Sequence, residues 1–296
     1  MENSNLPIKI DFEGVGKLSE PITKLIEVIS CAVGKVYEPT YIVRKAKADL
    51  KSKVITELSE LISNEIQHRG FKFFISQLEK KQLNIEKIIN KSIKYLPAEL
   101  SDPNMPNEGW ILDFFDLSQN CTDDDIQELW GKLLADEVDN PGSHSRRLMH
   151  TLKVMAPFEA KFFKNASEFR CRVYMRKKNL EKILKTDVTD NEAIIISVND
   201  DIIFGGHLGL DYEYDQLMYF EEIGLFNRLI FWGNEDGAEI YKLDFNGDEI
   251  NVKDAVIEIF EFTALGTELL NISMPNYDSR YREYVDEKLL QNNMKL

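Results

Sequence analysis

Three side chains near the middle of the chain have the types needed to cleave a phosphodiester bond. Arg146, Arg147 and His150 fall within one and a half helical turns, so an arginine could bind a phosphate while the histidine acts as acid and base. A metal-independent ribonuclease uses such groups. The spacing is shorter than in such nucleases and a second acid is absent, so a solvated or ion-paired helix face is the favoured interpretation. Arg147 and His150 remain the candidates for the catalytic alternative.

Two acidic stretches could hold a metal ion. Asp123–Asp125 supplies three neighbouring carboxylates, although the positive end of a helix explains such a run without a metal. Asp244–Glu249 has oxygen ligands at alternate positions, but its glycine precedes Asp248 and Ala255 stands where a calcium loop needs glutamate. Asn246-Gly247 instead predicts a type I′ hairpin turn. With no CxxC, HExxH or P-loop motif in the chain, we expect neither a metal nor a cofactor.

One cysteine lies among basic residues that could lower its pKa. Cys171 stands in the stretch RCRVYMRKK, and nearby cations favour the thiolate. No base partner is identifiable, so the basic run is interpreted first as a solvated face and second as a contact for an acidic partner or a phosphate.

Composition and charge exclude several classes of protein. The 296 residues have a formal net charge of −15, with 43% hydrophobic and 29% charged residues, and this balance is typical of a folded globular chain. Residues 1–100 carry 16 basic and 13 acidic side chains, whereas residues 201–296 carry 7 and 20. Nucleic-acid binding through the acidic C-terminal third is therefore disfavoured. Three dispersed cysteines, no apparent signal peptide and no long apolar run predict a cytoplasmic protein.

The N-terminal region is predicted to be helical and to offer a contact surface. Apolar positions over 22–36 recur at three- and four-residue steps after a possible N-cap at Ser19. Further helices are expected over 41–67 and 71–96, the latter with a break near Asn84. The first apolar face either packs on these helices or contacts a second copy, another protein or an anionic membrane. The predicted contact residues are Ile22, Leu25, Ile26, Ile29, Val33, Arg44, Lys45 and Lys47.

The remaining elements divide the chain further. A proline-rich loop over 97–109 separates a region at 1–96 from a central helical block at 108–186, in which Thr122 is expected to cap a helix. Trp130, Leu133 and Leu134 are expected to hold this block together. From 188 to 296 we expect strands, a hairpin and a helix capped by Thr263, in the order of a winged-helix module. The predicted fold class is α+β, mostly helical in its first two-thirds.

Two stretches of the chain resemble a known family. One is Lys17–Asp49, and the other is a spaced pattern whose positions are Leu129-Trp130, Leu133-Leu134, Glu137, Pro141-Gly142, Ser145, Arg147, Leu148, Leu152, Glu159-Ala160 and Phe162-Phe163. They resemble a bacterial family of uncharacterised proteins akin to abortive-infection alpha proteins, with a weaker similarity at Phe262–Leu270. The resemblance covers residues 17–165 and implies a role in phage defence. It supplies no catalytic residues.

We therefore expect a non-enzymatic protein that binds itself or another protein, with a role in phage defence by abortive infection. The first alternative is a nucleic-acid-binding regulator that uses a winged helix. The second is a nuclease that uses Arg147 and His150.

Overall fold

A computed structural model of the 296-residue chain describes residues 19–32, 65–177, 189–198, 201–202, 213–231, 238–252, 255–273 and a few positions between 283 and 289. The chain divides into two compact units, residues 1–157 and 158–296. The proline-rich loop over 97–109, which the sequence suggested as a boundary, lies inside the first unit. There the Lys24 ammonium donates to the Asp102 carbonyl over 2.6 Å, and the Ser101 amide donates to Asp139 over 2.6 Å.

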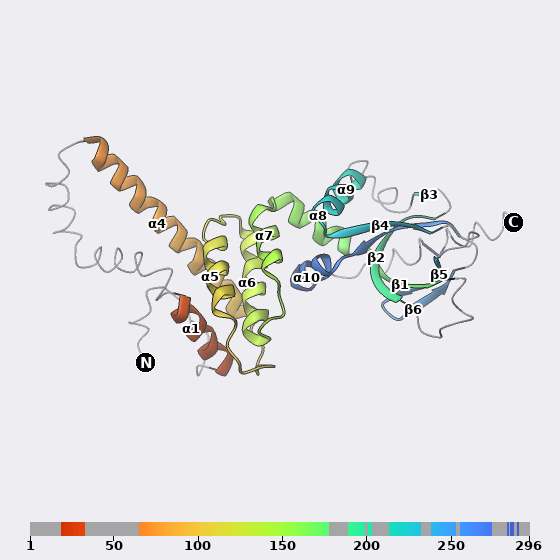
Figure 1. Cartoon of the computed structure of the whole chain (residues 1–296), viewed down its shortest axis with the longest axis horizontal. Coiled ribbons are helices and arrows are strands. Elements are labelled where there is room, and N and C mark those ends of the chain that lie inside the picture. Colours follow the sequence, from red (N-terminus) through yellow and green to blue (C-terminus); the bar gives the residue numbers. More distant parts are fainter. Residues whose placement is uncertain are drawn as a thin grey trace. The chain divides into compact units, whose positions relative to one another are not determined.

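The first unit is helical, as predicted (Figure 1). α6 packs along α4, and α5 packs on α7, while α1 contacts both α5 and α6. The elements are α1 (Glu20–Ala32), α4 (Glu65–Ser92), the 3-10 turn η2 (Ile93–Tyr95), α5 (Glu108–Ser118), α6 (Asp124–Asp139) and α7 (Arg146–Val154).

Polar side chains cap the starts of three of these helices. The Asp123 carboxylate accepts the backbone N–H groups of Asp125 and Ile126, each over 3.0 Å. The predicted cap at Thr122 is therefore wrong by one residue, whereas a helix N-terminus does explain the acidic run. Asn107 caps α5 and Ser145 caps α7 in the same way.

The centre of the first unit is a close contact between α4 and α6. Trp130 is fully buried and meets Phe114 edge to face at 5.2 Å between ring centroids. Gly131 lets the two helices approach, because a Cβ at that position would lie 2.9 Å from Lys91 Cβ. The predicted break of α4 near Asn84 is wrong. The Asn84 amide donates to the Gln119 carbonyl over 3.0 Å, so this side chain bonds a neighbouring segment and does not compete with its own helix.

A buried carboxylate holds the loop that joins α6 to α7. Glu137 is 1% exposed and accepts the backbone N–H groups of Gly142, over 2.7 Å, and His144, over 3.3 Å. Burial raises the pKa of this carboxyl group, and the hydrogen bonds oppose that rise. Gly142 has a φ of 86°, so the predicted end of α6 at Asn140-Pro141-Gly142 is confirmed.

The second unit contains a curved antiparallel sheet and the helices α8, α9 and α10 (Figure 1). Its path is β4-β7-β2-β1-β5-β6, and the short β3 pairs with the end of β2. The curvature brings residues of β4 close to residues of β5. The elements are α8 (Pro157–Ser167), β1 (Arg170–Lys177), β2 (Thr189–Val198), β3 (Asp201–Ile202), α9 (Glu213–Glu222), β4 (Phe226–Phe231), β5 (Ala238–Phe245), β6 (Asp248–Asn251), β7 (Ile257–Phe262) and α10 (Ala264–Ser273).

Apolar side chains cover both faces of the central strand β2. Ala193, Ile194 and Ile195 are all fully buried, which explains why the sequence has a continuous apolar run here instead of an alternating one. An aromatic cluster joins α8 to the sheet: Phe163 lies 5.7 Å from Phe226 between ring centroids, and Phe226 lies 4.7 Å from Phe262.

The α+β class is confirmed, but a winged helix is not shown. The hairpin expected to be the wing is β5–β6, and β5 pairs with β1 along most of its length. β1 was not predicted, because its basic residues suggested a solvated face. Its alternate residues Cys171, Val173 and Met175 are nevertheless buried, so the segment forms an inner strand of a larger sheet.

Candidate functional site

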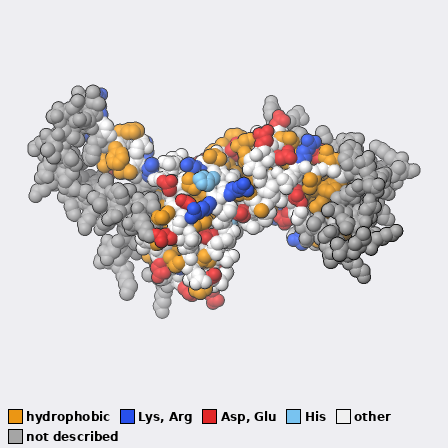
Figure 2. Space-filling view, in the orientation of Figure 1, with side chains coloured by type: hydrophobic (Ala, Val, Ile, Leu, Met, Phe, Trp, Pro, Cys, Tyr) orange, Lys and Arg blue, Asp and Glu red, His pale blue; other side chains and the backbone are white. Residues whose placement is uncertain are grey.

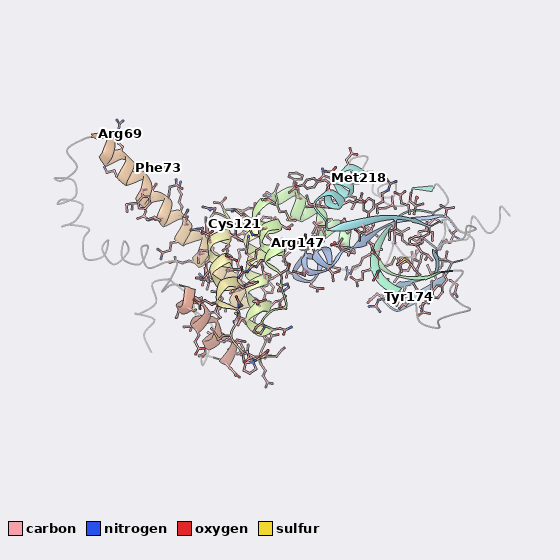
Figure 3. All side chains as sticks on the ribbon, viewed as in Figure 1. Arg69, Phe73, Cys121, Arg147, Tyr174 and Met218 are labelled. Carbon is pink, nitrogen blue, oxygen red and sulfur yellow. The ribbon has the colours of Figure 1, made fainter. Side chains whose placement is uncertain are left out.

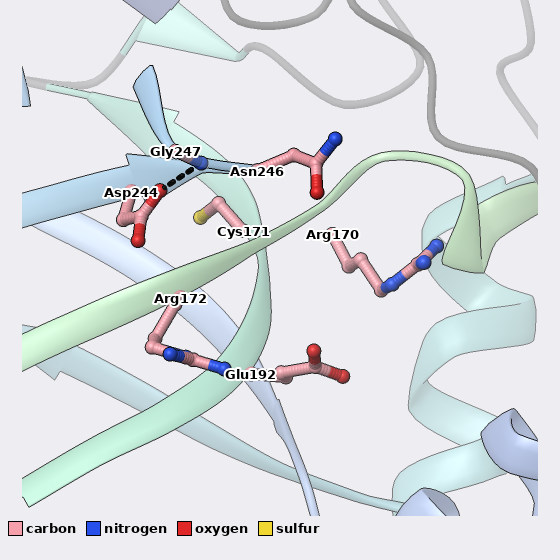
Figure 4. Close-up of a pocket in the computed structure, with 7 residues that line it drawn as sticks. All are labelled: Arg170, Cys171, Arg172, Glu192, Asp244, Asn246 and Gly247. Carbon is pink, nitrogen blue, oxygen red and sulfur yellow. Dashed lines mark hydrogen bonds between the residues drawn. The ribbon is translucent and has the colours of Figure 1, made fainter. Parts of the chain in front are cut away.

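A polar pocket of about 200 Å³ lies over β1, β2, β5 and the β5–β6 turn (Figure 4). Two guanidinium groups, two carboxylates and a side-chain amide surround it, so its formal charges balance. The lining residues are Arg170, Cys171, Arg172, Glu192, Asp244, Asn246 and Gly247.

The strand register brings opposite charges together in this pocket. On β1, Arg172 lies directly opposite Glu192 of β2 and also opposite Asp244 of β5. Residues that face each other in antiparallel strands point to the same side of the sheet. Arg170 lies two residues before Arg172 and therefore shares this side. The Arg170 Nη1 donates to the Ser167 carbonyl over 2.9 Å, so the end of α8 helps to position its guanidinium.

The hairpin turn forms the rim of the pocket. Asn246 has a φ of 57° and Gly247 a φ of 100°, so the predicted positive φ at both turn positions is confirmed. The Gly247 N–H donates to Asp244 over 2.6 Å and closes the turn. Glu249, the last residue of the stretch compared with a calcium loop, pairs with Lys242 over 2.8 Å. Within the part of the chain that the structure describes, no three His, Cys, Asp or Glu side chains are grouped as a metal site would require.

The pocket does not activate its cysteine. Cys171 is 3% exposed, and burial raises the pKa of its thiol, with Asp244 and Glu192 adding to the rise. The sequence raised the alternative that the neighbouring arginines lower this pKa, and the structure places the thiol where burial raises it instead. The strand alternation explains the difference, because it turns Cys171 inward while Arg172 points to solvent.

The basic residues of α7 lie on its exposed face. Arg146 pairs with Asp113 over 3.1 Å, as the ion-paired interpretation expected. Arg147 (Figure 3) and His150 are both exposed, and Figure 2 shows a histidine close to basic side chains. Their suggested role in catalysis stays a prediction.

The predicted contact residues of the first helix are largely inside the first unit. Ile22 is 6% exposed, Leu25 1% and Ile29 0%, while Ile26 is half-buried. Since α1 packs on α5 and α6, these side chains serve the core, as in the packing alternative. Val33, Arg44, Lys45 and Lys47 lie outside the described residues.

An exposed segment of α4 was not singled out from the sequence. We call residues 69–81 of α4 the projecting segment, because they extend beyond the part of α4 that packs on α6 (Figures 1 and 3). None of its described side chains is buried, and Phe73 and Phe74 are 65% and 56% exposed. The sequence HRGFKFFIS contained a signal for this exposure, because it has two adjacent phenylalanines. On an amphipathic helix, one of two adjacent apolar residues commonly lies outside the apolar face. None of the described helices is long and apolar enough to cross a bilayer.

Comparison with known proteins identifies a family but no function. The model of the DUF2806 family, described as a protein of unknown function, matches residues 68–286. This match covers well over half of the chain, so the protein belongs to the DUF2806 family. No curated protein and no solved structure matches the chain.

Proposed function

We propose that this DUF2806 protein is a non-enzymatic protein that assembles with further copies of itself and acts in phage defence by abortive infection. The observation that carries the assembly part is the exposure of Phe73 and Phe74 on the projecting segment of α4. The phage-defence part rests on the resemblance of residues 17–165 to proteins akin to abortive-infection alpha proteins.

Two exposed phenylalanines on one helix provide apolar area for an interface. Full burial of a phenylalanine side chain contributes about 1.5–3 kcal/mol, and aromatic residues are enriched at the centres of interfaces. With 65% and 56% of their areas accessible, Phe73 and Phe74 retain more than half of this contribution for a partner.

The charges near these rings favour a second copy as the partner. The projecting segment has four basic residues, Arg69, Lys72, Lys80 and Lys81, against the single acid Glu79. Two such segments would repel each other, whereas residues 201–296 carry 20 acidic and 7 basic side chains. The basic segment of one copy therefore complements the acidic C-terminal third of the next. Such a head-to-tail contact forms a ring or an open chain of copies.

Light scattering on the full chain tests this assembly. We expect an oligomer whose mass falls as salt rises, since the contact pairs charges near the surface. The double variant Phe73→Ser with Phe74→Ser is expected to be monomeric. Phe158→Ser is the matched control, because Phe158 is 61% exposed on another helix, and it is expected to keep the wild-type mass.

A monomeric wild-type chain at every concentration would refute self-assembly, as would a double variant that keeps the oligomer. Binding of the monomer to anionic vesicles would then point to the membrane alternative.

The proposed role in phage defence is tested separately by phage plating on cells that express each variant. We expect protection from the wild type and from Phe158→Ser, and none from the double variant.

One exposed surface bears on the alternatives that involve nucleic acid. Arg147, His150 and Lys153 are exposed on α7, and a basic helix face can contact a phosphate backbone. The regulator alternative expects DNA to be held by residues 188–296, so retention of DNA that falls with salt and is lost in Arg147→Ala with Lys153→Ala would instead assign the contact to α7. Loss of a nuclease activity in folded His150→Ala would be required for the catalytic alternative.

A further inference from the structure

The pocket on the sheet of the second unit offers partners for both a negative and a positive group. Arg170 and Asn246 provide donors, and Glu192 and Asp244 provide acceptors on the two strands that flank Arg172. We propose that this pocket binds a small zwitterion, an α-amino acid or a close amino carboxylate.

The pocket is small and polar. Its volume is about 200 Å³, whereas common ligand pockets are larger and mostly apolar. A small polar pocket with charged walls suits a compact ligand that is held by hydrogen bonds.

The donors are positioned by neighbouring backbone. Asn246 stands in the turn directly after β5, and it lines the pocket together with Arg170. The Ser167 carbonyl accepts from Arg170 Nη1, and the Asp244–Gly247 hydrogen bond holds the turn that carries Asn246. A guanidinium with a nearby amide donor is suited to a carboxylate.

The acceptors are positioned by the strand register. Glu192 and Asp244 lie on the two strands that flank Arg172, so their carboxylates can accept from the three N–H donors of an ammonium group. With two positive and two negative lining side chains, a neutral zwitterion adds no net charge. A simple anion or a simple amine would leave the pocket with a net charge.

Calorimetric titration of the full chain with millimolar ligands tests the proposal. The probes are glycine and L-serine, which carry both charges, and acetate and methylamine, which each carry one of the two. We expect glycine and L-serine to bind at least about tenfold more tightly than acetate or methylamine.

Two variants locate the binding. Arg170→Ala removes a guanidinium donor, and Glu192→Gln removes one negative charge with little change of shape. Each is expected to weaken binding of glycine by about tenfold to a hundredfold, the range for a lost charged hydrogen bond. Lys161→Ala is the control, because Lys161 is exposed on α8 and does not line the pocket, and it is expected to bind glycine like the wild type. Circular dichroism confirms that each variant is folded.

Three results would overturn the proposal: no heat of binding for glycine or L-serine, equal affinity for acetate and glycine, or unchanged affinity in folded Glu192→Gln. Without binding of glycine or L-serine, the charged side chains of the pocket would only form part of the sheet's surface. Equal affinity for acetate and glycine would indicate an anion site. Unchanged affinity in Glu192→Gln would show that glycine binds elsewhere on the protein. Self-assembly through α4 is measured by mass, so its failure is distinguishable from any of these.

Discussion

Replacement of Gly266 by alanine tests the contact between α10 and the sheet. An ideal Cβ at this position would lie 2.0 Å from the Leu225 carbonyl oxygen, where real Cβ contacts are essentially never shorter than 3.0 Å. Either α10 or the backbone at Leu225, just before β4, must therefore move by about 1 Å. The same carbonyl accepts the Thr263 N–H over 3.0 Å, so the movement also disturbs the start of α10.

The expected change in stability has two opposing parts. Alanine in a helix is favoured over glycine by about 1 kcal/mol. Overpacking costs about 1–3 kcal/mol, and a weakened backbone hydrogen bond costs about 1 kcal/mol more. Gly266→Ala should therefore lower the free energy of unfolding of the second unit by roughly 1–3 kcal/mol.

Two other helical glycines supply matched controls. Nothing lies within 4 Å of a Cβ at Gly70 in α4, so Gly70→Ala should stabilise by about 0.5–1 kcal/mol. Gly131→Ala, with its nearest contact at 2.9 Å, should fall between Gly70→Ala and Gly266→Ala. Scanning calorimetry is the assay, because it resolves units that unfold separately. A Gly266→Ala chain at least as stable as the wild type would refute the close approach, and destabilisation by Gly70→Ala would refute the open site in α4.

Further outcomes follow from the burial, the caps and the pKa shifts. Trp130→Ala should destabilise the first unit by about 3–5 kcal/mol in chemical denaturation, and an unchanged transition would contradict its place in the core. Asp123→Ala should lower the free energy of unfolding by about 1 kcal/mol, whereas Thr122→Ala should hardly change it. Chemical denaturation of the two variants compares these effects directly. The pKa of Glu137 is raised above 4.5 in the folded state, so its protonation stabilises the fold at low pH and this contribution is lost as pH rises above 4.5. The stability difference between the wild type and Glu137→Gln should therefore decrease with rising pH, and a difference independent of pH would contradict the burial. Cys171, whose thiol pKa is raised, should resist alkylation near neutral pH until the chain unfolds, as mass spectrometry can follow.

Local signals in the sequence predicted several elements correctly. The Asn246-Gly247 turn and the cap at Thr263 depend on neighbouring residues only, and both are present: Thr263 Oγ1 accepts the Gly266 N–H over 3.0 Å. The central helices and the burial of Trp130 followed from periodic apolar residues, and they are also confirmed.

The errors arose where distant parts of the chain decide the structure. β1 is stabilised by pairing with β2 and β5, which lie well after it in the sequence, so a window around Arg172 suggested only a basic run. Asn84 suggested a helix break because its partner, the Gln119 carbonyl, is far along the chain. The pocket could not be predicted for the same reason, since the register of three strands brings its residues together.

The order of the strands has a consequence for aggregation. β6 lies at one end of the sheet path and has four residues, Asp248–Asn251. Of these, Asp248, Glu249 and Asn251 are exposed, and Ile250 is buried. A short edge strand with two carboxylates resists the addition of a further strand, because a growing β-stack would align those charges from copy to copy. The C-terminal unit is thereby protected against amyloid-like growth at this edge of the sheet.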